Sequence, residues 1–147
     1  MYQKICVAVD GSNTSILAVE KAAQIAQAFN AKLLLLHVIR PMKIPPELER
    51  FLKADDLKTI RANALGDVGR EIMQKAQQKA ESLCHSDISQ KIIEGDPAPM
   101  IVKSAEQFNA DLIVMGTRGL NKVEGALIGS ISRKVANQTA LSVLIVK

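Results

Sequence analysis

Short apolar runs along the chain alternate with longer segments in which apolar residues recur every three or four positions. An apolar run that ends in polar residues is typical of a strand buried on both faces, and three- and four-residue spacing is typical of a helix with one apolar face. In residues 88–93, apolar and polar positions instead alternate, which favours a more exposed strand. The pattern predicts strands at 5–9, 33–38, 88–93, 111–115 and 142–146.

Helices are predicted between these strands, and several residues indicate where they begin and end. The predicted ranges are 13–29, a long stretch up to about residue 83, 97–108 and 130–138. Ser12 or Asn13 suits the first N-cap, and Asn30 suits the left-handed position after that helix. Asp96 is a candidate cap before a proline at the first helical position. The long stretch, which contains two glycines, is either one helix or two pieces.

Strands and helices therefore alternate from one end of the chain to the other. This order predicts an α/β fold with a mostly parallel sheet and helices on both of its faces. The length of 147 residues fits one domain, and no linker, repeat or low-complexity segment divides it. We expect a single domain spanning residues 1–147.

Composition and charge narrow the possible functions. Only 3% of the residues are aromatic and the formal net charge is +4, with no long run of like charges. Stacking platforms and basic tails for nucleic acid are therefore not expected. The first residues show neither a signal-peptide nor a transmembrane pattern, which predicts a cytoplasmic protein. Cys6 and Cys84 fit no metal or redox spacing, and Cys6 is expected to be a buried thiol.

Unusual residues follow two of the predicted strands. Asp10, Gly11 and Ser12 follow the first strand, and a glycine-containing loop follows the fourth and returns at Gly129 and Ser130. Ligands of open parallel sheets bind at the carboxyl ends of the strands, where the strand order reverses. Both segments are therefore candidates for a ligand site.

The return of that loop offers groups that can bind phosphate. Residues 130–132 would form the first turn of a helix, whose N–H groups lack intrahelical partners. Ser130 and Ser132 add hydroxyl groups, and Arg118 adds a positive charge. The alternative is that the glycines are ordinary turn residues and Ser130 is an ordinary cap.

Asp10 and the two histidines also have more than one interpretation. The Asp10 carboxylate can hold a metal ion or hydrogen-bond a sugar or base, or it can bond its own backbone in a turn. His37 and His85 have no ligand spacing and are expected to be structural or exposed. A phospho-acceptor domain of similar fold needs clustered acidic residues at the end of the first strand, where Asp10 stands alone.

The motif Gly116-x2-Gly119-x9-Gly129-Ser130 resembles that of the ATP-binding branch of the universal stress proteins. It occurs together with VAVDGS at 7–12, LLHV at 35–38, ADLIVMGTRG at 110–119 and GSIS at 129–132. The resemblance covers essentially the whole chain. It implies a five-stranded parallel sheet of order 3-2-1-4-5, of the adenine nucleotide alpha hydrolase-like type.

The resemblance further implies a ligand, a metal and a partner. ATP would bind with Mg²⁺ or Mn²⁺, and Asp10 is the one candidate metal ligand. The last strand, 142–146, would pair with that of a second copy in a homodimer. The residues implied to bind the nucleotide are Ala8, Asp10, Val38, Met115, Gly116, Arg118, Gly119, Gly129, Ser130, Ile131 and Ser132.

Three functions of different classes follow from this sequence. The first is a regulatory, ATP-binding sensor of the stress response. The second is an enzyme, a slow ATPase or a phosphoryl- or adenylyl-transfer catalyst, although no general base with an orienting partner is evident. Glu124 in the motif loop is expected to be solvated. The third is an interaction module that does not bind nucleotide, against which the intact glycine spacing argues.

Overall fold

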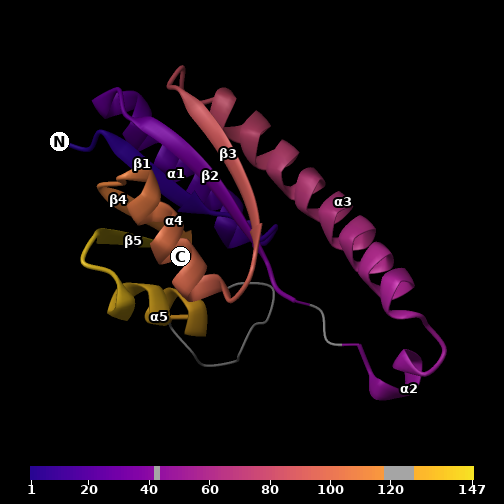
Figure 1. Ribbon diagram of the computed structural model, residues 1–147. Coiled ribbons are helices and arrows are strands. Elements are labelled where there is room, and N and C mark those ends of the chain that lie inside the picture. The colour runs from indigo at the N-terminus through magenta and orange to yellow at the C-terminus, as the bar shows by residue number, and fades with distance from the viewer. Residues whose placement is uncertain (42–43, 118–127) are drawn as a thin grey trace.

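A computed structural model describes residues 1–41, 44–117 and 128–147 (Figure 1). All neighbouring strands pair in parallel, in the order β3-β2-β1-β4-β5. The predicted fold class and strand order are therefore confirmed. The strands are β1 (Lys4–Ala8), β2 (Lys32–Ile39), β3 (Ile88–Glu94), β4 (Leu112–Gly116) and β5 (Ser142–Val146).

Helices cover both faces of the sheet. The core residues place α1 and α3 on one face and α4 and α5 on the other. The amino-terminal part of α3 runs past the sheet toward α2, which lies away from the other elements (Figure 1). In the described ranges no helix is long and apolar enough to cross a membrane. The helices are α1 (Asn13–Phe29), α2 (Pro46–Glu49), α3 (Ala54–Glu81), α4 (Pro97–Phe108) and α5 (Ser130–Gln138).

The core is aliphatic and has two layers, one on each face of the sheet. Leu33 and Leu35 of β2 pack on the α1 and α3 side, whereas Leu34 and Leu36 pack on the α4 and α5 side. Burial on both faces explains why the central strands read as continuous apolar runs. Cys6 is fully buried in the second layer, and burial raises the pKa of its thiol to about 12 against the opposing charge of Lys91.

The ends of the helices agree with the sequence at most positions. The Ser12 hydroxyl accepts a hydrogen bond from Ser15 N (3.2 Å), and Asn30 takes the left-handed conformation at φ 54°. α3 is one continuous helix that includes both of its glycines. The prediction for Asp96 is only half right, because it occupies the N-cap position of α4 but its side chain makes no capping hydrogen bond.

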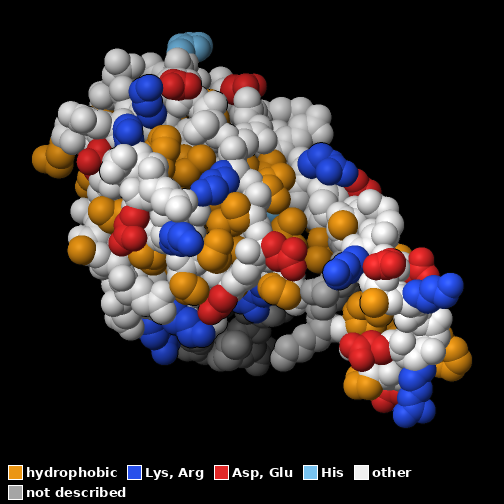
Figure 2. All heavy atoms as spheres, viewed as in Figure 1, with side chains coloured by type: hydrophobic (Ala, Val, Ile, Leu, Met, Phe, Trp, Pro, Cys, Tyr) orange, Lys and Arg blue, Asp and Glu red, His pale blue; other side chains and the backbone are white. Residues whose placement is uncertain are grey.

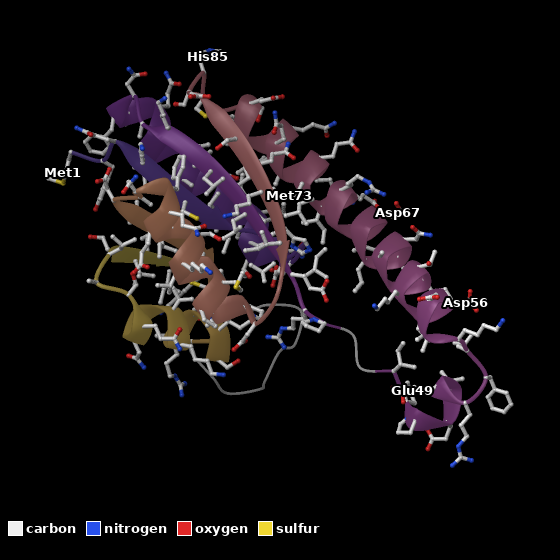
Figure 3. All side chains as sticks on the ribbon, in the orientation of Figure 1. Met1, Glu49, Asp56, Asp67, Met73 and His85 are labelled. Carbon is white, nitrogen blue, oxygen red and sulfur yellow. The ribbon has the colours of Figure 1, made fainter. Side chains whose placement is uncertain are left out.

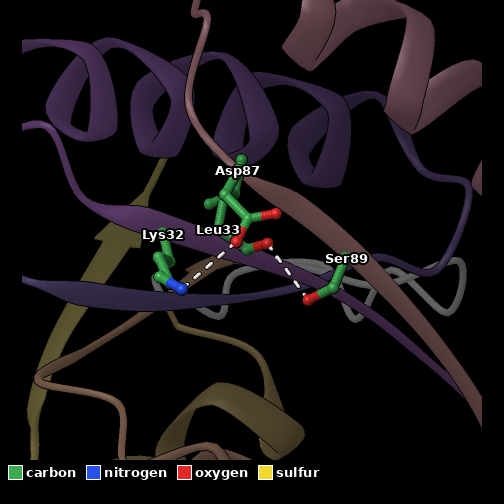
Figure 4. A network of polar contacts seen from close by, with 4 residues as sticks. All are labelled: Lys32, Leu33, Asp87 and Ser89. Atoms are coloured by element: carbon green, nitrogen blue, oxygen red, sulfur yellow. Dashed lines mark hydrogen bonds and ion pairs between the residues drawn. The ribbon is translucent and has the colours of Figure 1, made fainter.

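Polar contacts join β2 and β3 near their first residues (Figure 4). Lys32 Nζ lies 3.3 Å from Asp87 Oδ2, and the Ser89 hydroxyl donates to the Leu33 carbonyl at 3.4 Å. Because Lys32 and Asp87 are both well exposed, their ion pair contributes little to stability. These contacts lie at the amino ends of the strands and leave the carboxyl ends open for a site.

Candidate functional site

A cleft of about 400 Å³ lies at the carboxyl ends of β1, β2 and β4. β1 is the first strand of the chain and lies between β2 and β4, so the strand order reverses beside it. The first turns of α1 and α5, one side of α3 and part of α4 add to its walls. The cleft therefore lies at the switch point where open parallel sheets bind their ligands.

Every described residue of the predicted site lines this cleft. Arg118, Gly119 and Glu124 lie outside the described residues. The structure thus brings the two candidate segments together, while their role in binding a ligand stays a prediction. The residues that it places on the cleft are Ala8, Asp10, Val38, Met115, Gly116, Gly129, Ser130, Ile131 and Ser132.

Asp10 closes a turn between β1 and α1. Its Oδ1 accepts a hydrogen bond from Ser12 N at 2.9 Å, which is the local turn that the sequence offered as one alternative. Ser15 fastens the same turn, because its hydroxyl donates to the Ser12 carbonyl at 2.9 Å. The turn holds the Asp10 carboxylate at the edge of the cleft, where it can contact a ligand or a cation.

The start of α5 is tied to the end of β4. Gly129 N donates to the Thr117 carbonyl, and Thr117 N donates to the Val146 carbonyl at 2.8 Å. The buried Ser132 hydroxyl lies within bonding distance of the Thr117 and Gly129 carbonyls (3.1 and 3.0 Å). The Ser132 hydroxyl proton is therefore directed at the protein's own backbone. The exposed Ser130 is the better hydroxyl candidate for a ligand.

Gly116 is required by contacts inside the protein. A Cβ at this position would lie 2.7 Å from Thr14 Oγ1 and 2.9 Å from the Thr14 carbonyl carbon. Because Gly116 has no side chain, the first turn of α1 can pack against the end of β4. Gly116 is implied by the family resemblance to bind the nucleotide, and its contact with Thr14 is a separate physical reason for glycine at this position.

Sequence reasoning missed the wall that α3 contributes. Leu65, Val68 and Ile72 line the cleft from this helix. Their spacing of three and four residues marks one helix face, and that was the available signal. Arg40, directly after β2, adds a cationic residue to the same cleft.

The two histidines lie at different places in the fold. His37 is buried at the end of β2, and its Nδ1 lies 2.7 Å from the Val9 carbonyl oxygen. His85 is exposed and lies at the end of the molecule away from α2 (Figure 3). His37 is thus buried and bonded within the protein and His85 is exposed, while His37 also lines the cleft.

The fold and the cleft define a doubly wound α/β protein with a ligand site at its switch point. The family model for the universal stress protein family matches residues 1–147, and the chain belongs to this family. A universal stress protein of Methanocaldococcus jannaschii is 34% identical over 147 residues, which are 100% of this chain and 83% of that protein.

Two solved structures show the same architecture. A universal stress protein in complex with cAMP is 32% identical, with a TM-score of 0.72 over 99% of this chain and 96% of that one. The universal stress protein UspA from Lactobacillus plantarum is 26% identical, with a TM-score of 0.84 over 99% of this chain and 98% of its own.

Proposed function

We propose that this protein binds ATP together with a divalent cation in the cleft and acts as a regulatory, ligand-binding protein of the stress response. The start of α5 carries this proposal. Its N-cap residue is Gly129, which has no side chain to accept from the first-turn N–H groups. These groups have no intrahelical partners, and Ser130, Ile131 and Ser132 line the cleft. Such a helix start is suited to phosphate.

An adenine nucleotide is supported by the related protein in complex with cAMP, which matches nearly the whole chain at 32% identity. The cleft is lined by both apolar and polar side chains, which suits such a ligand. Val38 and Met115 are apolar, whereas Arg40 and Ser130 are polar and can face an anion. Ligand sites in general combine a largely apolar lining with a few polar groups.

The chemistry of Asp10 fits Mg²⁺ or Mn²⁺ held jointly with phosphate. Mg²⁺ keeps several waters and uses one or two carboxylates in addition to phosphate oxygens. Within residues 1–41, 44–117 and 128–147, no cluster of three His, Cys, Asp or Glu side chains could hold a metal by itself. A metal here would therefore depend on the nucleotide, with Asp10 as its protein ligand, and would neutralise phosphate charge.

Regulatory binding is preferred over efficient catalysis. Asp10 is the one acidic residue among the described residues that line the cleft. One of its oxygens accepts a hydrogen bond from Ser12 N. A hydrolase needs a group that orients the attacking water. Slow ATP hydrolysis or group transfer is the alternative, and the ADP formed over hours of incubation measures it.

Titration calorimetry with ATP and Mg²⁺ tests the proposal, with Gly129→Val as the decisive variant. Gly129 has φ −67° and ψ 162°, an extended conformation that valine adopts readily, so the variant should fold. Its side chain would obstruct the start of α5, and we expect ATP affinity to fall at least tenfold, about 1.4 kcal/mol.

The matched control is Gly66→Val, because a Cβ at this α3 position would meet only the Arg70 side chain. The control should bind ATP as the unaltered protein does. Unchanged ATP affinity in a folded Gly129→Val protein would remove the phosphate site from the start of α5. Absence of ATP binding in the unaltered protein would favour the interaction module.

The proposal includes a homodimer that forms through β5, with the protein located in the cytoplasm. β5 is a terminal strand of the sheet, and Val143, Leu144 and Ile145 are only half-buried. An apolar edge strand of this kind is suited to pairing with another strand. The cytoplasmic location stays a prediction from the sequence.

A further inference from the structure

We propose that His37 is a specificity-determining residue of the cleft. Its Nε2 accepts a hydrogen bond from an N–H or O–H group of the bound nucleotide. This inference rests on the proposed nucleotide binding and names one contact that selects the ligand. Four features of the structure carry it: the tautomer of the ring, its fixed position, the open second nitrogen and the apolar surroundings.

The hydrogen bond at Nδ1 sets the tautomer. Nδ1 lies 2.7 Å from the Val9 carbonyl oxygen, which can only accept, so Nδ1 carries the hydrogen and donates it. In a neutral imidazole with a hydrogen on Nδ1, Nε2 bears a lone pair and is an acceptor. The end of β1 therefore determines which kind of group His37 presents at its other nitrogen.

Close packing of α3 fixes the position of the ring. Gly69 lies over it, and a Cβ at that position would approach His37 Cδ2 to 3.3 Å and both His37 Nε2 and Ile39 Cδ1 to 3.7 Å. Glycine thus allows α3 to pack directly on the imidazole of His37, a residue that is 8% exposed. A ring held between the Val9 carbonyl and α3 presents Nε2 in one direction. Such preorganisation lowers the entropic cost of binding.

Nε2 is available to a ligand. Among the described residues none donates to it, and no buried side-chain nitrogen or oxygen there is left without a partner. Nε2 is therefore not fully buried, and His37 is one of the residues that line the cleft. It is a polar atom of a side chain more than nine-tenths buried, and a ligand donor can complete its hydrogen bonding.

The apolar lining of the cleft makes this hydrogen bond selective. Ile39, Val68 and Ile72 are apolar residues of the same cleft. A bound ligand that displaces water but offers no donor leaves the acceptor unpaired, which carries a desolvation penalty. A site built around one hydrogen bond can therefore discriminate strongly against an analogue that lacks it.

Two parts of an adenine nucleotide carry such donors, the exocyclic amine of the base and the ribose hydroxyls. ITP replaces the amine by a carbonyl, whereas 2′-deoxyATP and 3′-deoxyATP each lack one hydroxyl. The dissociation constants of all four nucleotides, measured with Mg²⁺ on the full chain, separate these sources. We expect ATP to bind about tenfold more tightly than the analogue that lacks the relevant donor.

His37→Leu should abolish this difference by removing the acceptor. His37→Gln should restore part of it, because an amide can donate to the Val9 carbonyl and still present an oxygen. Gly69→Ala retains His37 but displaces its ring, so it should reduce the difference and keeps the test available if His37→Leu does not fold. The matched control is His85→Leu on the exposed histidine, which should leave every ratio unchanged.

The outcomes are distinct. Loss of the ATP-to-ITP ratio in His37→Leu supports the inference with the base amine as donor, and loss of a ratio to either deoxy analogue supports it with that hydroxyl. An equal fall in affinity for all four nucleotides overturns it, since a merely structural histidine would act in this way. Failure of the unaltered protein to bind any nucleotide overturns the proposed function itself.

Discussion

Gly116 and Gly69 show that single glycines at this site serve close contacts between elements. At Gly116 the missing side chain leaves room for the first turn of α1, and at Gly69 it leaves room for the His37 ring. The first contact is with Thr14 backbone, which is rigid, whereas the second is with a side chain. Substitution should therefore be more damaging at Gly116.

Gly116→Ala is expected to destabilise the protein by about 1–3 kcal/mol, the usual cost of forcing extra atoms into a packed region. The added Cβ would lie 2.9 Å from the Thr14 carbonyl carbon, so α1 must shift. Urea unfolding followed by circular dichroism measures the change. Gly66→Ala is the control and should be neutral or slightly stabilising, because alanine favours helix. Equal stability of Gly116→Ala and the unaltered protein would contradict the packing role.

Predictions for single residues succeeded where contacts with neighbours in the sequence determine the conformation. Asn30 in the left-handed position and Ser12 as a cap depend on neighbouring residues, and both are observed. The hydroxyl of Ser132 was expected to face phosphate, but it bonds the carbonyls of Thr117 and Gly129. Thr117, fifteen residues from Ser132 in the sequence, is brought to it by the tertiary structure, which a local sequence pattern does not reveal.

At the scale of elements, Asp111 joins β4 to β1, the two strands on either side of the switch point. Its carboxylate accepts from Gln3 N at 2.7 Å and Lys4 N at 2.8 Å, and Asp111 N donates to the Lys4 carbonyl at 2.7 Å. The hydrogen bond from Gln3 N, followed by that from Lys4 N, lowers the pKa of the Asp111 carboxyl. The ionised form is therefore the one that holds the strand start.

This lowered pKa predicts a specific dependence of stability on pH. Because the folded pKa lies below the unfolded value of about 3.9, the stabilisation is present above that value and is lost as pH falls through the folded pKa. Asp111→Asn should lower the free energy of unfolding at pH 7 by no more than about 1 kcal/mol, since the carboxylate is exposed. The difference should shrink toward pH 2.

Urea unfolding at pH 7, 5, 3 and 2 measures this dependence on both proteins. Asp87→Asn is the matched control, because it alters an exposed ion pair with Lys32 at the start of another strand. The control should change stability by a few tenths of a kcal/mol at most. A difference for Asp111→Asn that stays constant from pH 7 to pH 2 would show that the hydrogen bonds do not depend on ionisation.

Elements were predictable from sequence to the extent that their own residues determine them. The five strands, the helices α1, α4 and α5 and the end of α3 follow from apolar runs and periodicity. Their observed bounds differ from the predicted ones by at most a residue or two. The use of Leu65, Val68 and Ile72 as a wall of the cleft was not predicted. Their apolar spacing predicts a buried face, but what that face covers depends on the path of α3 across the sheet.

The whole molecule has two sheet edges of different character. β3 exposes Ser89, Gln90 and the charged Glu94, whereas β5 consists of Ser142 followed by four apolar residues. Polar and charged side chains protect an edge against pairing, and apolar ones invite it. On the face shown in Figure 2, acidic, basic and apolar side chains are interspersed. The contrast predicts association through β5.

Ile145→Lys should convert the proposed homodimer into a monomer. Two copies paired through β5 across a two-fold axis would bring the two lysines near each other, where their repulsion opposes pairing. Ile92→Lys on β3 is the matched control, since Ile92 is a partly exposed isoleucine of the other edge strand. Light scattering on a gel-filtration column should give twice the 15.9 kDa chain mass for the unaltered protein and the control, and the single mass for Ile145→Lys. A dimer that persists in a folded Ile145→Lys protein would move the interface away from β5, and a monomeric unaltered protein would refute the homodimer.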